Sequence, residues 1–335
     1  MHKADSPQPP QGPRGLDRRT LLAAGLGALG LNAVPAFAAS PFPDRHITLV
    51  LPFPGGGMFD AVLRAMGNAA AQDLGQPVVL NHKPGAGGVS GTAGLAMMNE
   101  ADGYTLSVMH NSVIRHPHIT KVSWDPVKDF TYITGLASLT TGIAVAADAP
   151  WKSLEDLLAD AKARPGQITW GNVGATSANR IYGQRLAKAA GVEINFIPYK
   201  GGAEQVAAVL GGHLHVYGDP GFGAMALSGK LRLLATFTDQ RLPRWQQVPT
   251  VKELGHDLVI ESPVGIVAPK GLDPAIALRL QNALQKATKD PDYQRLSAEY
   301  DLVPWLLDGA AYQQYATKQF VREKQMLDEI GFKPS

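Results

Sequence analysis

Residues 51–60 read LPFPGGGMFD and place three consecutive glycines directly behind the β-branched, strand-like run 47–51. A helical spacing of apolar residues begins at Asp60, so the glycines lie between a strand and the start of a helix. Free N–H groups and the dipole at a helix start favour an anion, and glycine leaves the main chain open to it. We therefore expect this loop to bind an anionic ligand. Its candidate ligand-binding residues are Pro54, Gly55, Gly56, Gly57, Met58, Phe59 and Asp60.

A second loop, 170–180, follows the strand-like run 168–171 and reads WGNVGATSANR. Its small and hydroxyl residues stand again between a strand and a helix, where they offer hydrogen-bond donors to a ligand or cap the helix. We expect Arg180 either to grip a second ligand carboxylate in a bidentate fork or to be a solvated helix residue. Two such loops predict a cleft that closes on an anion from both sides. The candidates here are Asn172, Ala175, Thr176, Ser177 and Arg180.

Two of the candidate acids also have structural explanations. The carboxylate of Asp60 would repel an anion, so we favour a role as N-cap or first-turn acid over ligand contact. Asp219 follows the strand-like run 214–218 and could hold a ligand ammonium, but we favour its capping a turn at 220–221. Two further candidates, each just beyond a strand, are the hydrogen-bonding residues Ser112 and Tyr199, for which packing or capping is the alternative.

Several enzyme motifs are incomplete in this sequence. The glycine-rich run 81–91 lacks the third glycine of a dinucleotide fingerprint, and Pro84 interrupts its turn. Lys230 follows Gly229 but is not followed by the hydroxyl residue of a phosphate-binding P-loop. Ser90 lacks the glycine spacing of a hydrolase nucleophile elbow. No cofactor is expected, and a serine hydrolase is a disfavoured alternative.

The histidines raise a metal-dependent periplasmic hydrolase as a second alternative. His110, His116 and His118 lie close together in the sequence, and His213 and His215 would share one face of a strand. However, the chain has no Cys, no H-E-x-x-H motif and no carboxylates clustered with these histidines. We expect no metal site.

Strands and helices alternate along the chain, which predicts an α/β fold. The alternation runs from residue 47 to 109, with no further element expected before Ile143, and then restarts and continues to 236. A strand near 264–268 and three helices end the chain. We predict two lobes, each a mostly parallel sheet flanked by helices, with the chain crossing back to the first. The expected boundaries are 39–142 plus 262–335 for one lobe and 143–261 for the other.

The N-terminal segment 1–38 has the features of a cleaved export signal. Arg18 and Arg19 precede an apolar run of small residues, 23–34, and the segment ends in AFA. The arginine pair favours the twin-arginine route over the general secretory route. A membrane anchor is the alternative, but the glycines make the run weakly apolar for a span.

The rest of the chain is electrically balanced. The sequence has 31 Lys and Arg against 29 Asp and Glu, of which four and two lie in 1–38, leaving 27 of each (31 − 4 and 29 − 2). This balance lacks the basic excess of a nucleic-acid binder. Without Cys there is neither a disulfide framework nor a lipid-modified cysteine. The remaining 297 residues (335 − 38) suffice for two domains.

From about Ile47 to Ile330, the order and spacing of several motifs resemble the Bug, or TctC-like, solute receptors of tripartite tricarboxylate transporters. Each motif is weak alone, but together they are specific. They are PFP with GG and D at 52–60, N with PGAGG at 81–88, DGYTL at 102–106, PYKGG at 198–202, LGG at 210–212, GKLR at 229–232, VPTV with E and G at 248–255, and AP at 268–269.

The resemblance implies a periplasmic binding protein of the two-lobed, type II-like fold, with a hinge, an interlobe cleft and no catalytic activity. Its ligand is then a small organic mono- or dicarboxylate, held by backbone amides of the first loop and by the loop 170–180. Its partners are then the large and small integral membrane subunits of a tripartite transporter. A ligand sensor without a dedicated permease is the alternative. We expect a monomer.

The sequence departs from the family pattern in both loops. Met58 and Phe59 stand where the family usually has small residues or proline, so they either narrow the cleft or contact an apolar ligand body. Asn172, the pair 176–177 and Arg180 replace the usual Gly-Ser, second Gly-Ser and His pattern.

Overall fold

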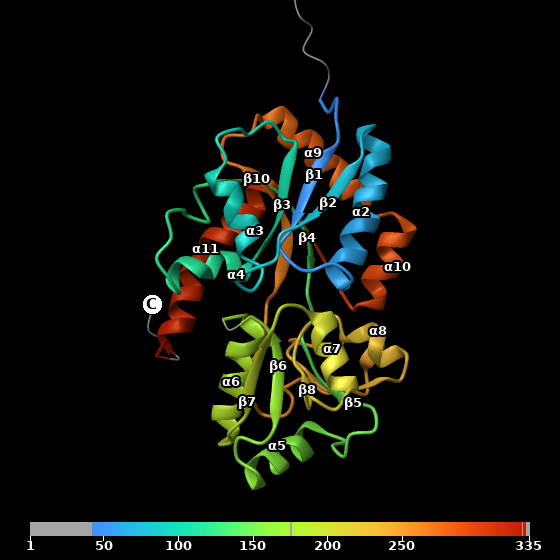
Figure 1. The fold of residues 1–335 in the computed structure, drawn as a ribbon, viewed down its shortest axis with the longest axis vertical. Coiled ribbons are helices and arrows are strands. Elements are labelled where there is room, and N and C mark those ends of the chain that lie inside the picture. Colours follow the sequence, from blue (N-terminus) through green and yellow to red (C-terminus); the bar gives the residue numbers. More distant parts are fainter. Residues whose placement is uncertain (1–41, 175, 330, 333–335) are drawn as a thin grey trace, which may run out of the picture. The chain divides into compact units, whose positions relative to one another are not determined.

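The computed structural model describes residues 42–174, 176–329 and 331–332. The predicted export signal, 1–38, lies outside these residues, as does the candidate Ala175. The described chain folds around two β-sheets with helices packed on them (Figure 1). We call the six-stranded sheet with its helices lobe 1 and the five-stranded sheet with its helices lobe 2.

In lobe 1 the strand order is β11-β4-β10-β3-β1-β2. The strands are β1 (Ile47–Leu51), β2 (Val78–His82), β3 (Thr105–His110), β4 (Phe130–Ser138), β10 (Pro263–Pro269) and β11 (Val303–Asp308). The helices are α2 (Met58–Leu74), α3 (Ser90–Ala93), α4 (Asn111–Arg115), α9 (Pro274–Ala287), α10 (Pro291–Glu299) and α11 (Gly309–Glu329), with 3₁₀ turns at Gly94–Met97 and His116–His118.

In lobe 2 the strand order is β7-β6-β8-β5-β9. The strands are β5 (Gly142–Ala146), β6 (Thr169–Val173), β7 (Asn195–Tyr199), β8 (Val216–Tyr217) and β9 (Leu231–Thr236). The helices are α5 (Leu154–Ala163), α6 (Ala178–Ala190), α7 (Gly202–Leu210) and α8 (Phe222–Leu227), and a 3₁₀ turn follows at Pro243–Trp245. Apart from Gly142, which begins β5, the strands of the two sheets fall on either side of the expected lobe boundaries, which themselves stay a prediction.

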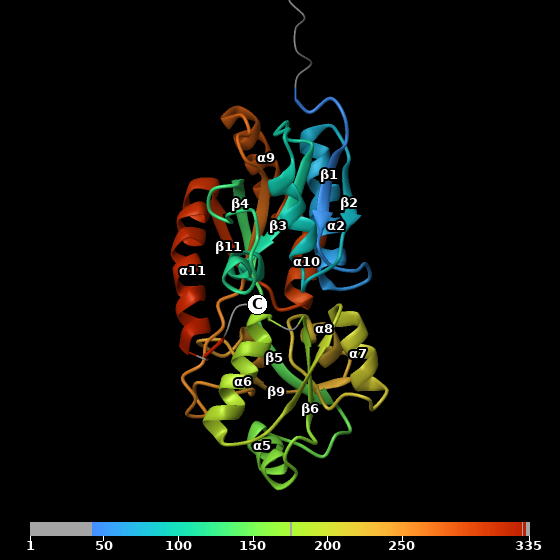
Figure 2. The ribbon, with the colours of Figure 1, turned by 60° about the vertical axis from the view of Figure 1, so that its left-hand side comes forward.

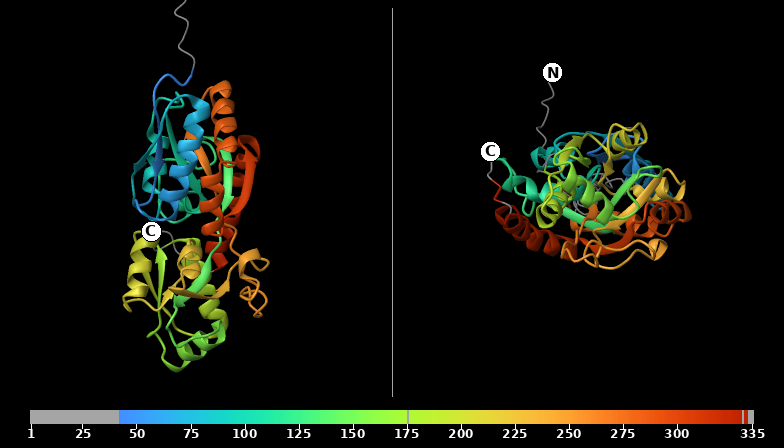
Figure 3. Two further views of the ribbon diagram at one scale, coloured as in Figure 1. Left: turned by 90° about the vertical axis from the view of Figure 1, so that its right-hand side faces the viewer. Right: turned by 90° about the horizontal axis from the view of Figure 1, so that it is seen from below.

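Both sheets are mixed, so the prediction of mostly parallel sheets is wrong. In lobe 1, β1 runs parallel to β2 and β3, whereas β10 is antiparallel to β3 and β4, and β11 is antiparallel to β4. In lobe 2, β6 is parallel to β7 and β8, and β5 is antiparallel to β8 and β9. The physical reason is the chain path: β4 leads out of lobe 1 and β10 returns, so these neighbours run in opposite directions (Figure 3).

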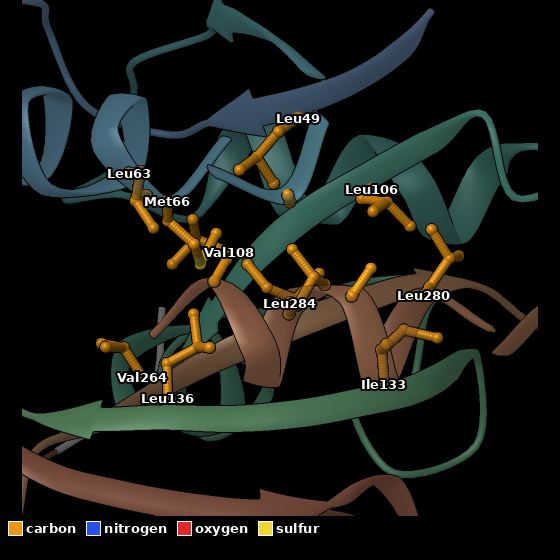
Figure 4. Packing of buried hydrophobic residues seen from close by; sticks show 14 of the residues in the cluster. Leu49, Leu63, Met66, Leu106, Val108, Ile133, Leu136, Val264, Leu280 and Leu284 are labelled. Atoms are coloured by element: carbon orange, nitrogen blue, oxygen red, sulfur yellow. The ribbon is translucent and has the colours of Figure 1, made fainter. Parts of the chain in front are cut away.

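The core of lobe 1 lies between its sheet and the helices α2 and α9. The predicted helical spacing places Leu63 and Met66 of α2 on a buried face, opposite Leu49 and Leu106 of the sheet and Leu284 of α9 (Figure 4). Burial of such side chains is the main stabilising contribution, and truncating one to Ala typically costs about 2–5 kcal/mol. This packing fixes the end of α2 at which the glycine loop lies.

Helix α11 runs along lobe 1 and its last turns reach α6 of lobe 2 (Figure 2). There Leu327 packs with Ile181 of α6 and with Ile119. One turn earlier, the buried Glu323 pairs with the buried Arg115 of α4, with Nε–Oε2 and Nη2–Oε1 distances of 2.5 and 3.1 Å. The lobes are thus joined by a packed contact as well as by the connecting segments 139–141 and 237–262.

Candidate functional site

A cavity of about 540 Å³ lies between the lobes and is lined by residues of both. Lobe 1 contributes the glycine loop after β1 and the start of α4. Lobe 2 contributes the starts of α6 and α7 and the segment around α8. The main lining segments are 53–59, 110–112, 177–179, 200–204, 219–221 and 224–225, with Gly87, Leu139, Val173, Val206, Tyr217, Ser262 and Tyr300.

Helices α2 and α7, which begin at this cavity, have no side-chain cap for their first N–H groups, whereas α6, which also begins there, is capped by Ser177. The N-cap residues of α2 and α7 are Gly57 and Gly201, and neither has a side chain that could accept a hydrogen bond from the first N–H groups of its helix. The starts of α5, α9 and α10 lie away from the cavity and each has a side-chain cap, from Ser153, Asp273 and Asp290 respectively. The uncapped N–H groups, one set from each lobe, are therefore available to an anion in the cavity.

Each of the two uncapped helices carries an acid at its third position that closes the preceding turn. Asp60 of α2 accepts a hydrogen bond from the Gly56 backbone and bonds with Arg64 and His82 at 2.9 and 2.7 Å. Burial raises the pKa of Asp60, but the bonds from His82 and Arg64 outweigh burial and hold that pKa below its ordinary value. Glu204 of α7 accepts from the Lys200 N–H at 3.0 Å. Asp60 is thus the first-turn acid that we favoured, and it does not line the cavity.

Large apolar side chains form much of the cavity wall. Phe53 and Phe59 stack with ring centroids 4.7 Å apart, and Phe53 also packs against the His110 ring at 5.4 Å. Met58, in the first turn of α2, lines the cavity from lobe 1, and Met225 of α8 lines it from lobe 2. The wall is therefore suited to contact with apolar ligand atoms.

His110 is a neutral part of this wall. Burial lowers its pKa to about 4. Its Nε2 lies 3.0 Å from the Gly88 carbonyl oxygen, and because a carbonyl only accepts, Nε2 carries the proton. His110 therefore offers no positive charge to a ligand at neutral pH.

Asp219 is a buried acid on the lobe 2 side of the cavity. Its two carboxylate oxygens accept from the side-chain amides of Asn179 and Gln205, and it also accepts from the Val173 N–H. Burial raises the pKa of Asp219 to about 7, although these bonds oppose the rise. Its described hydrogen bonds thus join β6, α6 and α7, whereas the turn role that we favoured would need bonds to the segment 220–221.

Three of the places at which the two lobes approach each other around the cavity are at glycines. A Cβ placed on Gly174 would lie 2.7 Å from the Cα of Gly87. A Cβ placed on Gly201 would lie 3.4 Å from Pro54 Cδ. A Cβ placed on Gly221 would lie 3.4 Å from Met58 Cβ. At Gly174 the two backbones therefore approach each other more closely than a side chain would allow, whereas at Gly201 and Gly221 a Cβ would be in ordinary van der Waals contact with the other lobe.

The structure brings nine of the candidate residues to the cavity. The first loop contributes all of its candidates except Asp60, and lobe 2 contributes Ser177 and Asp219. The Ser177 hydroxyl also accepts from the Arg180 N–H at 3.3 Å, so this residue caps α6 as well. The nine residues are Pro54, Gly55, Gly56, Gly57, Met58, Phe59, Ser112, Ser177 and Asp219.

Four candidates of lobe 2 lie outside the cavity lining, each for a specific reason. Asn172 is fully buried in β6 and its amide donates to the Gly174 carbonyl. The Thr176 carbonyl accepts from Arg115 Nη1 at 2.8 Å, which ties this loop to lobe 1. The Arg180 guanidinium donates to the Phe196 carbonyl at 3.2 Å, away from the cavity. Tyr199 packs at the edge of a lobe 2 core cluster.

The sequence reasoning missed most of the lining contributed by lobe 2. The start of α7, including Lys200 and Gly201, lines the cavity, as do Asn179 and Met225, and from lobe 1 Tyr300 was missed as well. The PYKGG motif marks a strand followed by a glycine-started helix, which is the signal by which the first loop was found. The same argument would have found the start of α7.

The histidines do not gather into a metal site in the part of the chain that the structure describes, where no three His, Asp or Glu side chains come together in that way. His118 bonds to the Phe320 carbonyl at 2.8 Å, and His215 Nδ1 accepts from the Thr169 N–H at 3.0 Å. No helix within the described ranges is both long and apolar enough to cross a membrane.

Comparison with known proteins agrees with this architecture. The family model described as "Tripartite tricarboxylate transporter family receptor" matches residues 62–332. The chain is 42% identical over 315 residues to the "UPF0065 protein in gbd 5'region" of Cupriavidus necator, covering 93% of this chain and 96% of that protein.

Solved structures resemble it as well. The periplasmic binding protein BugD superposes with a TM-score of 0.83 at 27% identity, over 88% of this chain and 100% of that chain. R. palustris Rpa4515, solved with adipate, has a TM-score of 0.81 at 25% identity, over 88% and 100% of the two chains. The two-lobed binding-protein fold and the Bug or TctC-like resemblance are thereby confirmed. The chain belongs to the receptor family of the tripartite tricarboxylate transporters.

Proposed function

We propose that this protein is a periplasmic, non-enzymatic receptor that binds a small organic carboxylate in the interlobe cavity. The observation that carries the proposal is the pair of uncapped helix starts, α2 from lobe 1 and α7 from lobe 2, that face one cavity. The helix starts away from the cavity at α5, α9 and α10 are capped by side chains, whereas the starts of α2 and α7 keep their first N–H groups free of side-chain caps where a ligand can reach them. The relative solved with adipate supports a carboxylate as the ligand.

Binding would then proceed by closure of the lobes on the ligand. The ligand enters the open cleft, and the N–H groups behind Gly57 take its carboxylate. Lobe 2 then approaches lobe 1, and the close approach of Gly174 to Gly87 would belong to this closed state. Closure excludes water, which strengthens the hydrogen bonds to the carboxylate. The closed monomer would deliver the ligand to the large and small membrane subunits of a tripartite transporter.

The first test is native mass spectrometry of gently purified protein, followed by release and identification of any bound molecule. We expect a carboxylic acid of defined mass, and thermal stabilisation by that acid when it is added back. Thermal stabilisation follows from mass action when a ligand binds only the folded state. An empty protein that no member of a broad carboxylate panel stabilises would contradict the receptor proposal.

A pair of variants tests the helix N–H groups directly. Gly202 is the first residue of α7, and its predecessor Gly201 is extended, so proline is tolerated at 202 while its N–H is lost. Gly202→Ala is the matched control, because it adds a Cβ but keeps the N–H. A hydrogen bond to a charged group contributes about 1.5–3 kcal/mol, so Gly202→Pro should bind carboxylate roughly ten- to a hundredfold more weakly than Gly202→Ala. Equal affinities would remove α7 from the binding site.

A further inference from the structure

We infer that the ligand carries one carboxylate on a bulky apolar body, so that a monocarboxylate is preferred over a dicarboxylate of the same length. This inference rests on the proposed function and names the class of ligand that the same cavity accepts. It follows from the size of the cavity, the side chains of its wall and the charges that line it.

The cavity is larger than a carboxylate head group requires. Its volume of about 540 Å³ lies within the range of about 300–1,000 Å³ of pockets that bury drug-sized molecules. The two uncapped helix starts lie next to each other, because a Cβ placed on Gly201 at the α7 start would lie 3.4 Å from Pro54 Cδ in the α2 loop. One carboxylate can therefore be shared between them, and most of the remaining space is left for the rest of the ligand.

The wall around that space is apolar on both sides of the cleft. Lobe 1 contributes the stacked rings of Phe53 and Phe59 together with Met58. Lobe 2 contributes Val206 and Met225. Met and aromatic side chains adapt to irregular apolar surfaces, so they favour a hydrocarbon or aromatic body over a polar one.

The charges of the lining disfavour a second carboxylate. Among the described residues that line the cavity, the acids are Asp219 and Glu204, and the basic side chains are Lys200 and His110. Lys200 is exposed, and the buried His110 is neutral, with its proton on the nitrogen that bonds to Gly88. A second carboxylate would thus enter an apolar space that has no buried cation to pair with it. Leaving such a charge unpaired is strongly unfavourable.

The position of Arg180 removes the most obvious partner for a second carboxylate. Its guanidinium donates to the Phe196 carbonyl and lies over the Phe196 ring at 5.8 Å, and neither residue lines the cavity. The expected bidentate pair between Arg180 and a ligand is therefore not formed by this arrangement.

The test uses two pairs of ligands whose members share a chain or ring and differ only at the far end. Hexanoate ends in a methyl group where adipate has a carboxylate, and p-toluate ends in a methyl group where terephthalate has a carboxylate. Isothermal titration calorimetry on the mature protein gives the affinity for each. We expect the methyl-ended member of at least one pair to bind at least about tenfold more tightly than its dicarboxylate.

Tighter binding of adipate and terephthalate would overturn this inference and leave the carboxylate receptor standing. Binding of no member of either pair, together with no response to a broader carboxylate panel, would overturn the inference and the proposed function alike. The two failures are therefore distinguishable in one experiment.

A matched pair of variants on α8 places a cation inside or outside the cavity. Met225 lines the cavity, whereas Leu227 on the same helix is 53% exposed and does not. Met225→Lys should lower the preference for the methyl-ended ligands by about tenfold or more, because the new ammonium group can pair with the second carboxylate. Leu227→Lys should leave the preference unchanged. An unchanged preference in both variants would show that this wall does not contact the far end of the ligand, contrary to the inference.

Discussion

The proposed closure of the lobes should depend on the absence of a side chain at Gly174, and this dependence can be measured. Gly174 has φ +77° and meets Gly87, which has φ +64°, across the cleft. In the closed structure a Cβ on Gly174 would lie 2.7 Å from the Gly87 Cα, whereas carbon atoms normally pack at about 3.5–4.0 Å. Gly174→Ala should therefore separate these loops by roughly 1 Å and disfavour the closed state.

The left-handed backbone at Gly174 adds a second cost that must be separated from the contact. An L-residue at such a φ costs about 1–2 kcal/mol whether the cleft is open or closed. Gly166 of lobe 2 has φ +71°, and a Cβ there would have nothing within 4 Å. Gly166→Ala is thus the matched control for the backbone cost alone. Both variants should lose similar thermal stability in the ligand-free state.

The two variants should differ in ligand affinity. Overpacking of a close contact costs about 1–3 kcal/mol, and if this falls on the closed state it weakens binding by about 5- to 150-fold. Gly166→Ala should bind as wild type does. Calorimetry with the tightest carboxylate of the panel measures the difference, and small-angle X-ray scattering of the ligand-bound forms reports the extent of closure. Wild-type affinity in Gly174→Ala would refute the idea that this glycine contact is part of the liganded state.

Four further measurements follow from individual residues. The pKa of Asp219 is raised to about 7 from 3.8, so the folded protein keeps a proton that the unfolded chain has lost, and this group should lower the free energy of unfolding as pH rises from about 4 to about 7. Asp219→Asn should remove that contribution in urea titrations. The pKa of His110 is lowered to about 4 from 6.5, so between these pH values the folded protein binds fewer protons than the unfolded chain. This group should therefore lower the free energy of unfolding as pH falls from about 6.5 to about 4, and His110→Gln should abolish that loss. Arg115→Met removes the ion-pair partner of the buried Glu323 and should lower the free energy of unfolding by about 3–5 kcal/mol. The double variant Arg115→Met, Glu323→Leu should recover part of that free energy, and an equal loss in the single and double variants would contradict the coupling of the two side chains. Arg180→Ala should leave carboxylate affinities unchanged, and a loss confined to dicarboxylates would restore the paired role expected from the sequence.

Most elements could be predicted from the sequence, but the longest strand could not. β4 is buried along nearly its whole length, so it shows no alternation of polar and apolar residues and no helical spacing. β11 contains Pro304, which argues against a strand in isolation, yet it lies at the sheet edge where proline is tolerated. Both strands were missed because their formation depends on pairing with strands that are distant in the sequence.

The same limit applies to the site. The glycine loop of α2 is a local feature, and the structure places most of it at the cavity. Asn172 was expected in a loop after a strand ending at Gly171, but β6 continues to Val173 and pairs Asn172 with Pro198, which turns its side chain into lobe 2. The arrangement of the two lobes, which places Met225 of lobe 2 in the same cavity as Met58 of lobe 1, cannot be predicted from the sequence around either residue.

The chain path also has a consequence for the order in which the protein can fold. The strands of lobe 2 are contiguous, from Gly142 to Thr236, so this lobe can form from one uninterrupted stretch. In lobe 1, β3 ends at His110 and its partner β10 begins at Pro263, 153 residues later (263 − 110). Until β10 is present, one side of β3 is an unpaired edge, which is slow to complete and open to association with other chains. Lobe 2 should therefore acquire protection from hydrogen exchange before lobe 1 during refolding, and chaperone binding should be strongest while that edge is open.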